Sequence, residues 1–411
     1  VMPQDRRTFL EWCAALGAAW PGTLRAMAPS PRKGSYDVLV VGAGVFGIWT
    51  AHSLSRAGRR VAVVDAVGPA HSAASSGGET RVTRCGYGDA AIYTDWACRS
   101  IAEWQALSQR SRLPLFRELG VLWVHREDDP RVAATARTMA ERGLAYETLD
   151  EAELRRRYPV MNVAAGESGF LEPSAGGLLA RRSVQFLAAE LAESGVAFLH
   201  GRVEPITRSL AQGGALRAVT TAAGSEIRAD QFVFACGPWL GRVCPDAMRG
   251  RLFVTRQEVF YFGVDAGASG ALPVWADLPF YGLPSIEGRG FKVANDRHGE
   301  RVNPGTLQRR ASERGEAEAR EFLARRFPAL ARAPLTEARV CQYENTSSGD
   351  FVIDRHPGMS NVWLAGGGSG HGFKHGPAIG AHVAALLGGE ARPLQRFSIA
   401  TKALEQRRAV Q

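Results

Sequence analysis

The stretch "YDVLVVGAGVFGIWTAHSLSRAGRRVAVVDA", residues 36–66, predicts a strand, a tight turn, a helix and a second strand. An apolar run over 38–41 ends at a glycine, and the helix is expected to reach about Arg56. A second apolar run covers 61–64, after Gly58. Uninterrupted apolar runs are typical of strands that are buried on both faces, as in a parallel sheet. These residues therefore predict a βαβ unit within an α/β fold.

The turn of this unit carries a dinucleotide-binding fingerprint. Gly42, Gly44 and Gly47 form the pattern G-x-G-x-x-G, and Asp65 ends the second strand 23 residues after the first of these glycines. The glycines allow a tight turn, backbone contact with a pyrophosphate and close packing of the helix. Asp65 is expected to accept a hydrogen bond from a ribose hydroxyl. The fingerprint alone does not separate NAD from FAD.

Two later segments repeat the order of buried strand and glycine-rich turn. They are "DQFVFACGPWLGRV", residues 230–243, and "NVWLAGGGSGHGFKHGPAIG", residues 361–380. Turns that are distant in the chain and converge on one long ligand favour FAD, whose flavin lies far from its adenine.

The segments between these turns predict a second domain. Residues 252–264 and 288–296 alternate in polarity, as half-exposed antiparallel strands do, and residues 98–177 read as helix-rich. The expected architecture is a discontinuous FAD-binding Rossmann-like domain plus an α+β substrate domain with an antiparallel sheet. The FAD-binding domain is assigned to 36–97, 178–244 and 336–390, the substrate domain to 98–177 and 245–335, and a C-terminal tail to 391–411.

Charge and cysteine content exclude several classes of protein. The net charge is +9, but the arginines are interleaved with acidic residues and no nucleic-acid-reading motif accompanies them. The six cysteines show no metal-ligand spacing, so no metal site is predicted. No uninterrupted apolar run reaches membrane-spanning length, which argues against stable membrane insertion.

The N-terminus resembles a twin-arginine export signal over residues 1–28. Arg6 and Arg7 precede a short apolar stretch, and "AMA" at 26–28 offers a cleavage site. This predicts a periplasmic or exported protein. The alternative is an amphipathic helix of the mature fold in a cytoplasmic protein.

Two segments are more specific than the glycine fingerprint: "GGETRVTRCGYGD", residues 77–89, and "CQYENTSSGDFVIDRHPGMSNVWLAGGGSGHGFKHG", residues 341–376. Through them the chain resembles, over about residues 36–390, monomeric sarcosine oxidase, N-methyltryptophan oxidase and pipecolate oxidase. These belong to the D-amino acid oxidase superfamily. The resemblance implies a monomeric FAD-dependent oxidase of a secondary or N-substituted amino acid. Hydride passes from the C–H beside nitrogen to flavin N5, and molecular oxygen is reduced to hydrogen peroxide. The product is an imine that hydrolyses.

The resemblance also implies the residues that hold FAD. Cys341 matches the cysteine that binds the flavin covalently as a thioether; the alternative is an inert strand cysteine. Arg81 is expected against the flavin ring or, as the second choice for this role, as the ligand of the substrate anion. The helix start expected at Ser369–Gly372 would aim N–H groups and His371 at the flavin pyrimidine. The remaining predicted cofactor contacts are Gly237, Gly370 and Gly372, whereas Cys236 is expected in the core.

Lys374 and Arg84 match the two cations that bind the substrate carboxylate. Only four of the 50 basic residues are lysines, which makes a lysine within a glycine-rich turn notable. The alternative for Lys374 is a surface lysine. Lys292 matches the lysine that promotes reaction with oxygen, the alternative being an exposed strand lysine. Tyr281 and Tyr343 match aromatic residues of the substrate pocket, although core tyrosines would look the same.

Two positions depart from sarcosine oxidase. Gly77 and Asp296 stand where that enzyme has histidines. A carboxylate at 296 leads to the hypothesis that the substrate is not sarcosine and carries a cationic or hydroxyl-bearing side chain. Two other functions remain open: a dehydrogenase of the same fold that passes electrons to a quinone or carrier, and a non-catalytic flavin-binding protein.

Overall fold

The computed structural model describes residues 36–126, 128–265 and 271–407. The predicted export signal at 1–28 lies outside these residues. Among them, no helix combines the length and the apolar character that a membrane span requires.

The first sheet is parallel at its centre. Its strands follow the order β17-β18-β11-β1-β2-β9, with β10 paired to β11. β17 and β10 are antiparallel to their neighbours, and the other pairs are parallel. The bounds are β1 (Tyr36–Val41), β2 (Val61–Asp65), β9 (Ala197–His200), β10 (Ala218–Thr220), β11 (Glu226–Phe234), β17 (Val352–Arg355) and β18 (Val362–Gly366).

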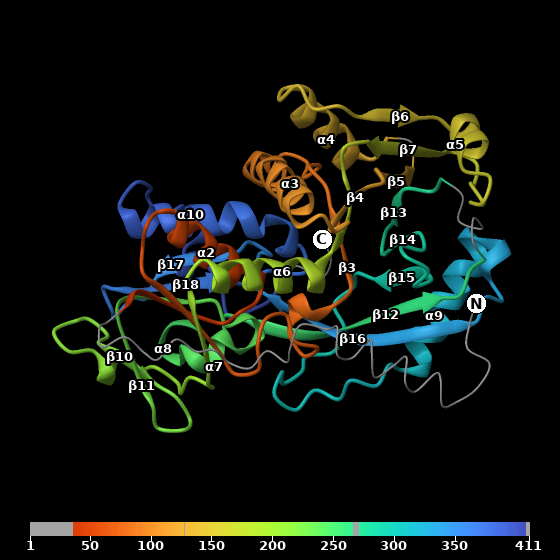
Figure 1. The fold of residues 1–411 in the computed structure, drawn as a ribbon. Helices are drawn as coiled ribbons and strands as arrows, with labels where there is room; N and C mark the ends of the chain where they lie inside the picture. The colour runs from red at the N-terminus through yellow and green to blue at the C-terminus, as the bar shows by residue number, and fades with distance from the viewer. Residues whose placement is uncertain (1–35, 127, 266–270, 408–411) are drawn as a thin grey trace, which may run out of the picture. The chain divides into compact units, whose positions relative to one another are not determined.

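Helices cover one face of this sheet (Figure 1). Val38 and Val40 of β1 point into a core shared with four helices, whereas Leu39 and Val41 point into a second core on the opposite face. This alternation explains why both kinds of position are apolar. The helices are α2 (Val45–Arg56), α3 (Ala91–Ser111), α6 (Ala180–Glu193) and α10 (Gly376–Gly388), and the short α7 (Leu240–Val243) and α8 (Pro245–Met248) lie on the second face.

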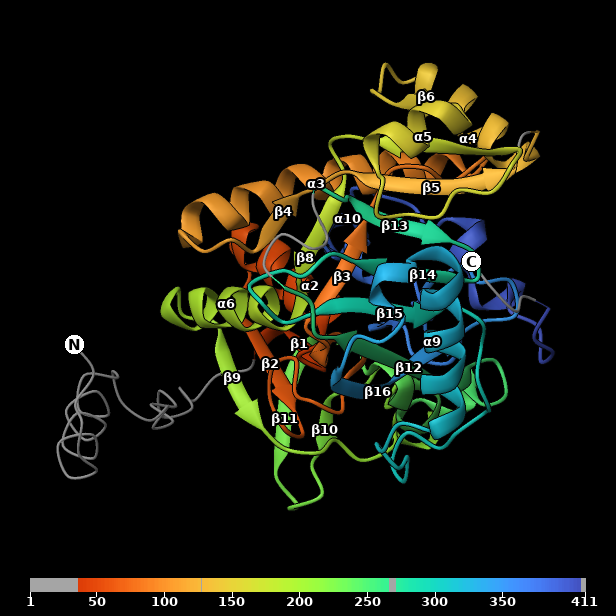
Figure 2. The same ribbon diagram turned by 90° about the vertical axis from the view of Figure 1, so that its right-hand side faces the viewer.

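The second sheet is largely antiparallel and has the order β16-β12-β15-β14-β13-β5-β7-β6. Only β13 and β5 pair in parallel. α9 (Glu313–Arg326) packs on it and lies in front of β12 and β15 in Figure 2. The strands are β5 (Val121–Arg126), β6 (Glu147–Leu149), β7 (Glu167–Glu172), β12 (Phe253–Phe262), β13 (Val274–Asp277), β14 (Phe280–Leu283), β15 (Phe291–Asn295) and β16 (Leu335–Asn345).

A three-stranded sheet of β3 (Thr80–Thr83), β8 (Gly176–Leu179) and β4 (Phe116–Glu118) completes the fold. Residues 98–177 hold most of α3, together with α4 (Pro130–Ala140) and α5 (Glu151–Arg157), but they also supply β5, β6 and β7 to the second sheet. The helix-rich reading of this region missed these strands, because β6 is only three residues long and β7 gains its burial from distant strands.

The βαβ prediction for residues 36–66 is confirmed, including a helix that ends at Arg56. The helix start expected at Ser369–Gly372 is wrong. That segment is a turn, followed by a 3₁₀ helix (Phe373–His375) and then by α10 from Gly376. Gly367, Ser369 and Gly370 have φ angles of 67°, 46° and 80°, in the left-handed region that cannot continue a right-handed helix.

Candidate functional site

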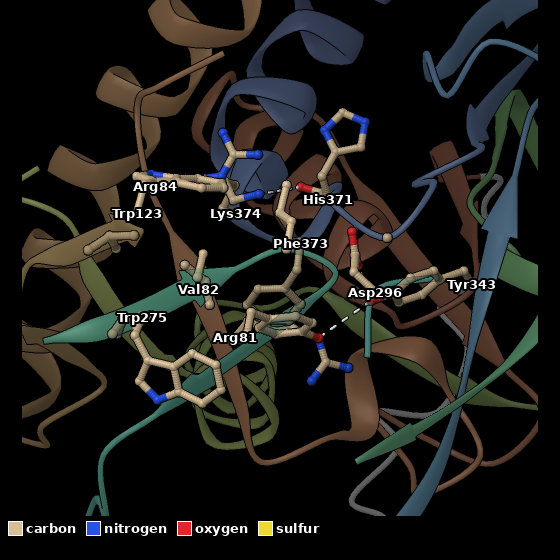
Figure 3. Close-up of a pocket in the computed structure, with 16 residues that line it drawn as sticks. Arg81, Val82, Arg84, Trp123, Trp275, Asp296, Tyr343, His371, Phe373 and Lys374 are labelled. Atoms are coloured by element: carbon tan, nitrogen blue, oxygen red, sulfur yellow. Dashed lines mark hydrogen bonds between the residues drawn. The ribbon is translucent and has the colours of Figure 1, made fainter. Parts of the chain in front are cut away.

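A cavity lies where β3, β5 and β13–β16 meet the turn that follows β18 (Figure 3). Seven predicted site residues line it: Arg81, Arg84, Tyr281, Tyr343, Gly370, His371 and Lys374. Asp296 and apolar side chains complete the wall: Val82, Val121, Trp123, Val274, Trp275, Ala276, Leu278 and Phe373. Residues from five strands, from the connections beside them and from the turn after β18 are thus brought to a single space.

Arg84 and Lys374, here called the cation pair, meet at Tyr87. Lys374 is only 4% exposed, and its Nζ donates hydrogen bonds to Tyr87 Oη (3.0 Å) and to the carbonyl oxygen of His371 (3.1 Å). The Arg84 Cζ atom lies 4.2 Å from the ring centre of Tyr87 and 4.7 Å from that of Trp123. Such cation–π contacts fix the guanidinium in place. The alternative of a surface lysine at 374 is wrong.

Glu172 at the end of β7 holds the connection that carries Arg84. Its Oε2 atom accepts hydrogen bonds from the backbone N–H groups of Cys85 (2.6 Å) and Gly86 (3.1 Å), and its Oε1 atom accepts one from Trp123 Nε1 (3.1 Å). Sequence reasoning missed Glu172, Trp123 and Tyr87. Tyr87 carried a signal, since it lies three residues after Arg84 in a segment already singled out. Glu172 carried none, because it lies 87, 86 and 49 residues from Cys85, Gly86 and Trp123.

Asp296, Tyr343 and Tyr281, here called the acidic side, form a second polar part of the cavity. Tyr343 Oη donates a hydrogen bond to Asp296 Oδ1 (2.9 Å) and lies 3.4 Å from Tyr281 Oη. Burial, with the nearby charge of Asp296, raises the pKa of Tyr281 to about 12. Burial also raises the pKa of Tyr343, so both tyrosines stay protonated at neutral pH and present hydroxyl groups beside a carboxylate.

Lys292 on β15 is buried next to this cavity, with 2% of its surface exposed. Its Nζ donates to the carbonyl oxygen (3.2 Å) and the hydroxyl (3.3 Å) of Thr80 and lies 5.5 Å from the ring centre of Tyr281. Burial, and then the charge of Arg81, lowers its pKa to about 7. The alternative of an exposed strand lysine is wrong.

A second cavity adjoins the first and shares four lining residues with it: Arg81, Tyr343, Gly370 and Phe373. The rest of its lining comes from the start of α2, the turns after β2, β11 and β18, and β16: Gly44, Val45, Phe46, Ser75, Ser76, Ala235, Gly237, Cys341, Gln342, Glu344, Gly368, Ser369 and Gly372. The start of α2 and the turns after β11 and β18 are those that the sequence expected to converge on FAD. A long ligand can therefore follow these turns and end beside the cation pair.

The glycines of the first turn are required where the chain packs closely against its own backbone. Gly42 has a φ of 106°, and a Cβ atom there would lie 2.4 Å from the carbonyl oxygen of Ala235. A Cβ atom on Gly47 would lie 1.9 Å from the carbonyl oxygen of Gly42. Within the described part of the chain, the Glu344 Oε1 atom is buried in this cavity without a hydrogen-bond partner. Buried polar atoms normally have partners, which indicates that a ligand supplies one here.

The other predicted cofactor residues lie as follows. Cys341 is half-buried on β16, and its Sγ atom is 3.6 Å from Arg81 Nη2. Asp65 accepts hydrogen bonds from the N–H groups of Ala43, Val67 and Gly68, so it supports the turn, and its contact with a ribose stays a prediction. The two ring nitrogens of His371 lie 3.3 Å from Tyr87 Oη and 3.0 Å from the carbonyl oxygen of Gly349.

Comparison with known proteins gives consistent matches. The family described as DAO, FAD dependent oxidoreductase, matches residues 37–386. Monomeric sarcosine oxidase of Streptomyces avermitilis is 33% identical over 377 residues, covering 88% of this chain and 97% of that protein. Monomeric sarcosine oxidase of Arthrobacter sp. is 30% identical over 391 residues, covering 92% and 99%. A modified fructosyl peptide oxidase from Aspergillus nidulans has the same fold, with a TM-score of 0.78 at 20% identity, covering 91% of this chain and 96% of that one.

Proposed function

The chain belongs to the DAO family of FAD-dependent oxidoreductases, and from this premise we propose that it oxidises a secondary or N-substituted amino acid with molecular oxygen. Similarity to sarcosine oxidases over about nine-tenths of the chain supports an FAD-dependent oxidase acting on a CH–NH group. The observation that carries the proposal is the convergence of Arg84 and Lys374 on Tyr87 in the first cavity. That cavity adjoins the second one, here called the cofactor cavity, where FAD would bind.

The cation pair would bind the substrate carboxylate. An arginine and a lysine that are already fixed by Tyr87 and Trp123 lose little freedom when the carboxylate arrives. Holding the carboxylate sets the position of the adjacent carbon and its C–H bond. When bound, FAD accepts a hydride from that carbon and passes the electrons to oxygen.

The acidic side would select the side chain of the substrate. Asp296 is buried, and its Oδ1 atom accepts a hydrogen bond from Tyr343. A substrate group that approaches this carboxylate must satisfy it with a positive charge or with hydroxyl donors, since an apolar group would leave it desolvated. We therefore propose that the preferred substrate carries an ammonium group or hydroxyls, unlike sarcosine.

Cys341 and Lys292 would complete the site. Cys341 lines the cofactor cavity and is half-buried, which supports a covalent bond from its sulfur to the flavin. Lys292 is a buried amine whose charge would stabilise the negative charge that develops on oxygen during its reduction. This role favours an oxidase over a dehydrogenase that uses a quinone.

The test is a screen of N-methyl, cyclic and glycated amino acids for hydrogen peroxide release, with sarcosine included. Peroxide from a cationic or hydroxylated substrate at a higher kcat/KM than from sarcosine supports the proposal. Best turnover on sarcosine contradicts the proposed selectivity. Reduction of the flavin by amino acids without peroxide release contradicts an oxidase, and no reduction at all contradicts an enzyme of this class. Flavin that remains with acid-precipitated protein would support the bond to Cys341.

A further inference from the structure

Two thiols face each other where the connection that carries Arg84 meets α3. The Sγ atom of Cys98, in α3, lies 2.8 Å from the Sγ atom of Cys85. This separation exceeds the length of a disulfide bond, about 2.05 Å, by only about 0.8 Å. Cys85 is buried and Cys98 is half-buried. A small movement of either side chain would therefore bring the sulfurs to bonding distance.

The position of Cys85 connects this pair to substrate binding. Cys85 follows Arg84 directly, and its backbone N–H donates to Glu172. Tyr87, two residues further on, contacts both members of the cation pair. A covalent bond from Cys85 to α3 would give this connection a second anchor beside Glu172.

We propose that Cys85 and Cys98 form a disulfide in the oxidised enzyme, with hydrogen peroxide as the oxidant, and that this bond fixes the position of Arg84. The disulfide goes beyond the proposed function, because its formation depends on the sulfur geometry and not on the identity of the substrate. The peroxide would come from the enzyme's own turnover or from its surroundings.

The reaction consumes two thiols and one peroxide and yields a disulfide and two waters. The Cys98 thiolate attacks one peroxide oxygen, the O–O bond breaks, and hydroxide leaves as water after it takes a proton. The sulfur of Cys85 then attacks the resulting sulfenic sulfur, the S–S bond forms and the second water leaves. Each sulfur loses one electron and each peroxide oxygen gains one.

The surroundings of the two thiols indicate which one reacts with peroxide and which one then attacks the sulfenic sulfur. The hydrogen bond with Cys85 lowers the pKa of Cys98, and the same hydrogen bond, together with burial, raises the pKa of Cys85. Cys98 is also the more accessible sulfur. It is therefore the thiol that peroxide meets first, and Cys85 is the one that resolves the sulfenic acid.

Peptide mapping tests the bond directly. Trypsin cleaves after Arg84 and Arg99, so one peptide, residues 85–99, holds both cysteines. Holoenzyme is treated with hydrogen peroxide, alkylated without reductant and digested. The proposal predicts an unlabelled peptide that is lighter by two hydrogens than the dithiol, and a doubly labelled peptide if reductant precedes alkylation. A doubly labelled peptide after peroxide treatment, or a bond from either cysteine to another one, overturns it.

Kinetics test the effect on Arg84. In the wild type, reductant is expected to raise the KM for the best substrate by about threefold or more, with kcat within about twofold. Cys85→Ser, Cys98→Ser and the double variant should each show the higher KM without reductant, and the double should be no worse than the singles. Cys244→Ala, in the opposite core, should keep the reductant response. A Cys98→Ser enzyme that still responds to reductant as the wild type does overturns the positioning role. If no substrate is found, the peptide map still decides the disulfide.

Discussion

Arg84 and Lys374 present two positive charges to one part of the cavity, whereas Asp296 presents a carboxylate to another. The cation pair is held by aromatic rings and by Tyr87 Oη, and Asp296 is held by the hydroxyl of Tyr343. A carboxylate is common to all amino acids, so under the proposed function the cation pair would recognise the class of substrate. The acidic side would meet what differs between amino acids, and so it would determine which member of the class is preferred.

The two parts also differ in how the chain builds them. The two residues of the cation pair are 290 positions apart in the chain. Glu172, in a third segment, holds the connection that carries Arg84 by accepting a hydrogen bond from the backbone of Cys85. The acidic side comes from β14, β16 and the residue after β15, which are strands of one sheet. Changing a side chain at the acidic side leaves the sheet intact, whereas the cation pair depends on contacts between sheets. Loss of the cation pair should therefore cost more than loss of the acidic side.

The largest effect is expected from Lys374→Met. Removing one partner of a desolvated charge pair costs about 2–5 kcal/mol, so kcat/KM for every amino acid should fall by about 100-fold or more. Steady-state kinetics with matched flavin content measure this. Lys402→Met removes another buried lysine, whose Nζ donates to the carbonyl oxygen of Arg396, and should keep the wild-type KM. An equal loss in both variants would mean that Lys374 acts through stability alone.

Lys292→Met separates substrate binding from the oxygen reaction. The buried amine lies beside the cavity but contacts Thr80, so reduction of the flavin by substrate should change by less than about threefold. Reoxidation by oxygen should slow by about 100-fold, as when a preorganised charge is removed. Stopped-flow measurement of the two half-reactions distinguishes these steps. If Lys292→Met slows flavin reduction and flavin reoxidation equally, Lys292 would take part in substrate binding, as the cation pair does.

Asp296→His tests the acidic side. Replacing the carboxylate should lower kcat/KM for the cationic or hydroxylated substrate and raise it for sarcosine, changing their ratio by about tenfold or more. The matched control is Asp296→Asn, which can still accept the hydrogen bond of Tyr343 but lacks the charge. If Asp296→Asn keeps the wild-type ratio, a hydrogen-bond acceptor at position 296 is sufficient for substrate selection and the negative charge is not needed. An unchanged ratio in both variants would remove Asp296 from substrate selection.

The pH dependence of reoxidation should follow Lys292. Its pKa is about 7, so the amine is cationic below that pH and neutral above it. The rate of reaction with oxygen should therefore fall by about tenfold for each pH unit above about 7, towards the rate of Lys292→Met. The same measurement on Lys292→Met should give a flat profile. A wild-type rate that rises with pH would contradict the assignment.

The smallest effect is expected from Tyr87→Phe, which keeps the ring beneath Arg84 and removes the hydroxyl that Lys374 contacts. Loss of the hydrogen bond to the charged Lys374 costs about 1.5–3 kcal/mol at most, and water can replace part of it and of the contacts that the hydroxyl makes with His371 and His375. KM should rise by about three- to tenfold with little change in kcat. Tyr87→Leu, which also removes the ring, should cost clearly more; equal effects would show that the ring does not position Arg84.

Sequence reasoning succeeded where the determinants are local. The βαβ unit of 36–66 follows from apolar runs and glycines that are neighbours in the chain, and the structure confirms it. Lys374 could be singled out because lysine is rare here and this one lies among glycines. Glu172 could not be found, since its partners lie in β5 and in the connection after β3. The strands β5–β7 were missed for the same reason, as their burial comes from pairing with distant residues.

The most direct test of recognition by the cation pair compares the best substrate with its carboxamide in the wild type and in Lys374→Met. The amide has the same shape but no charge. We predict that the wild type prefers the carboxylate by about 100-fold or more in kcat/KM, and that Lys374→Met reduces this preference to about tenfold or less. An unchanged preference in Lys374→Met would contradict the assignment of Lys374 to the carboxylate.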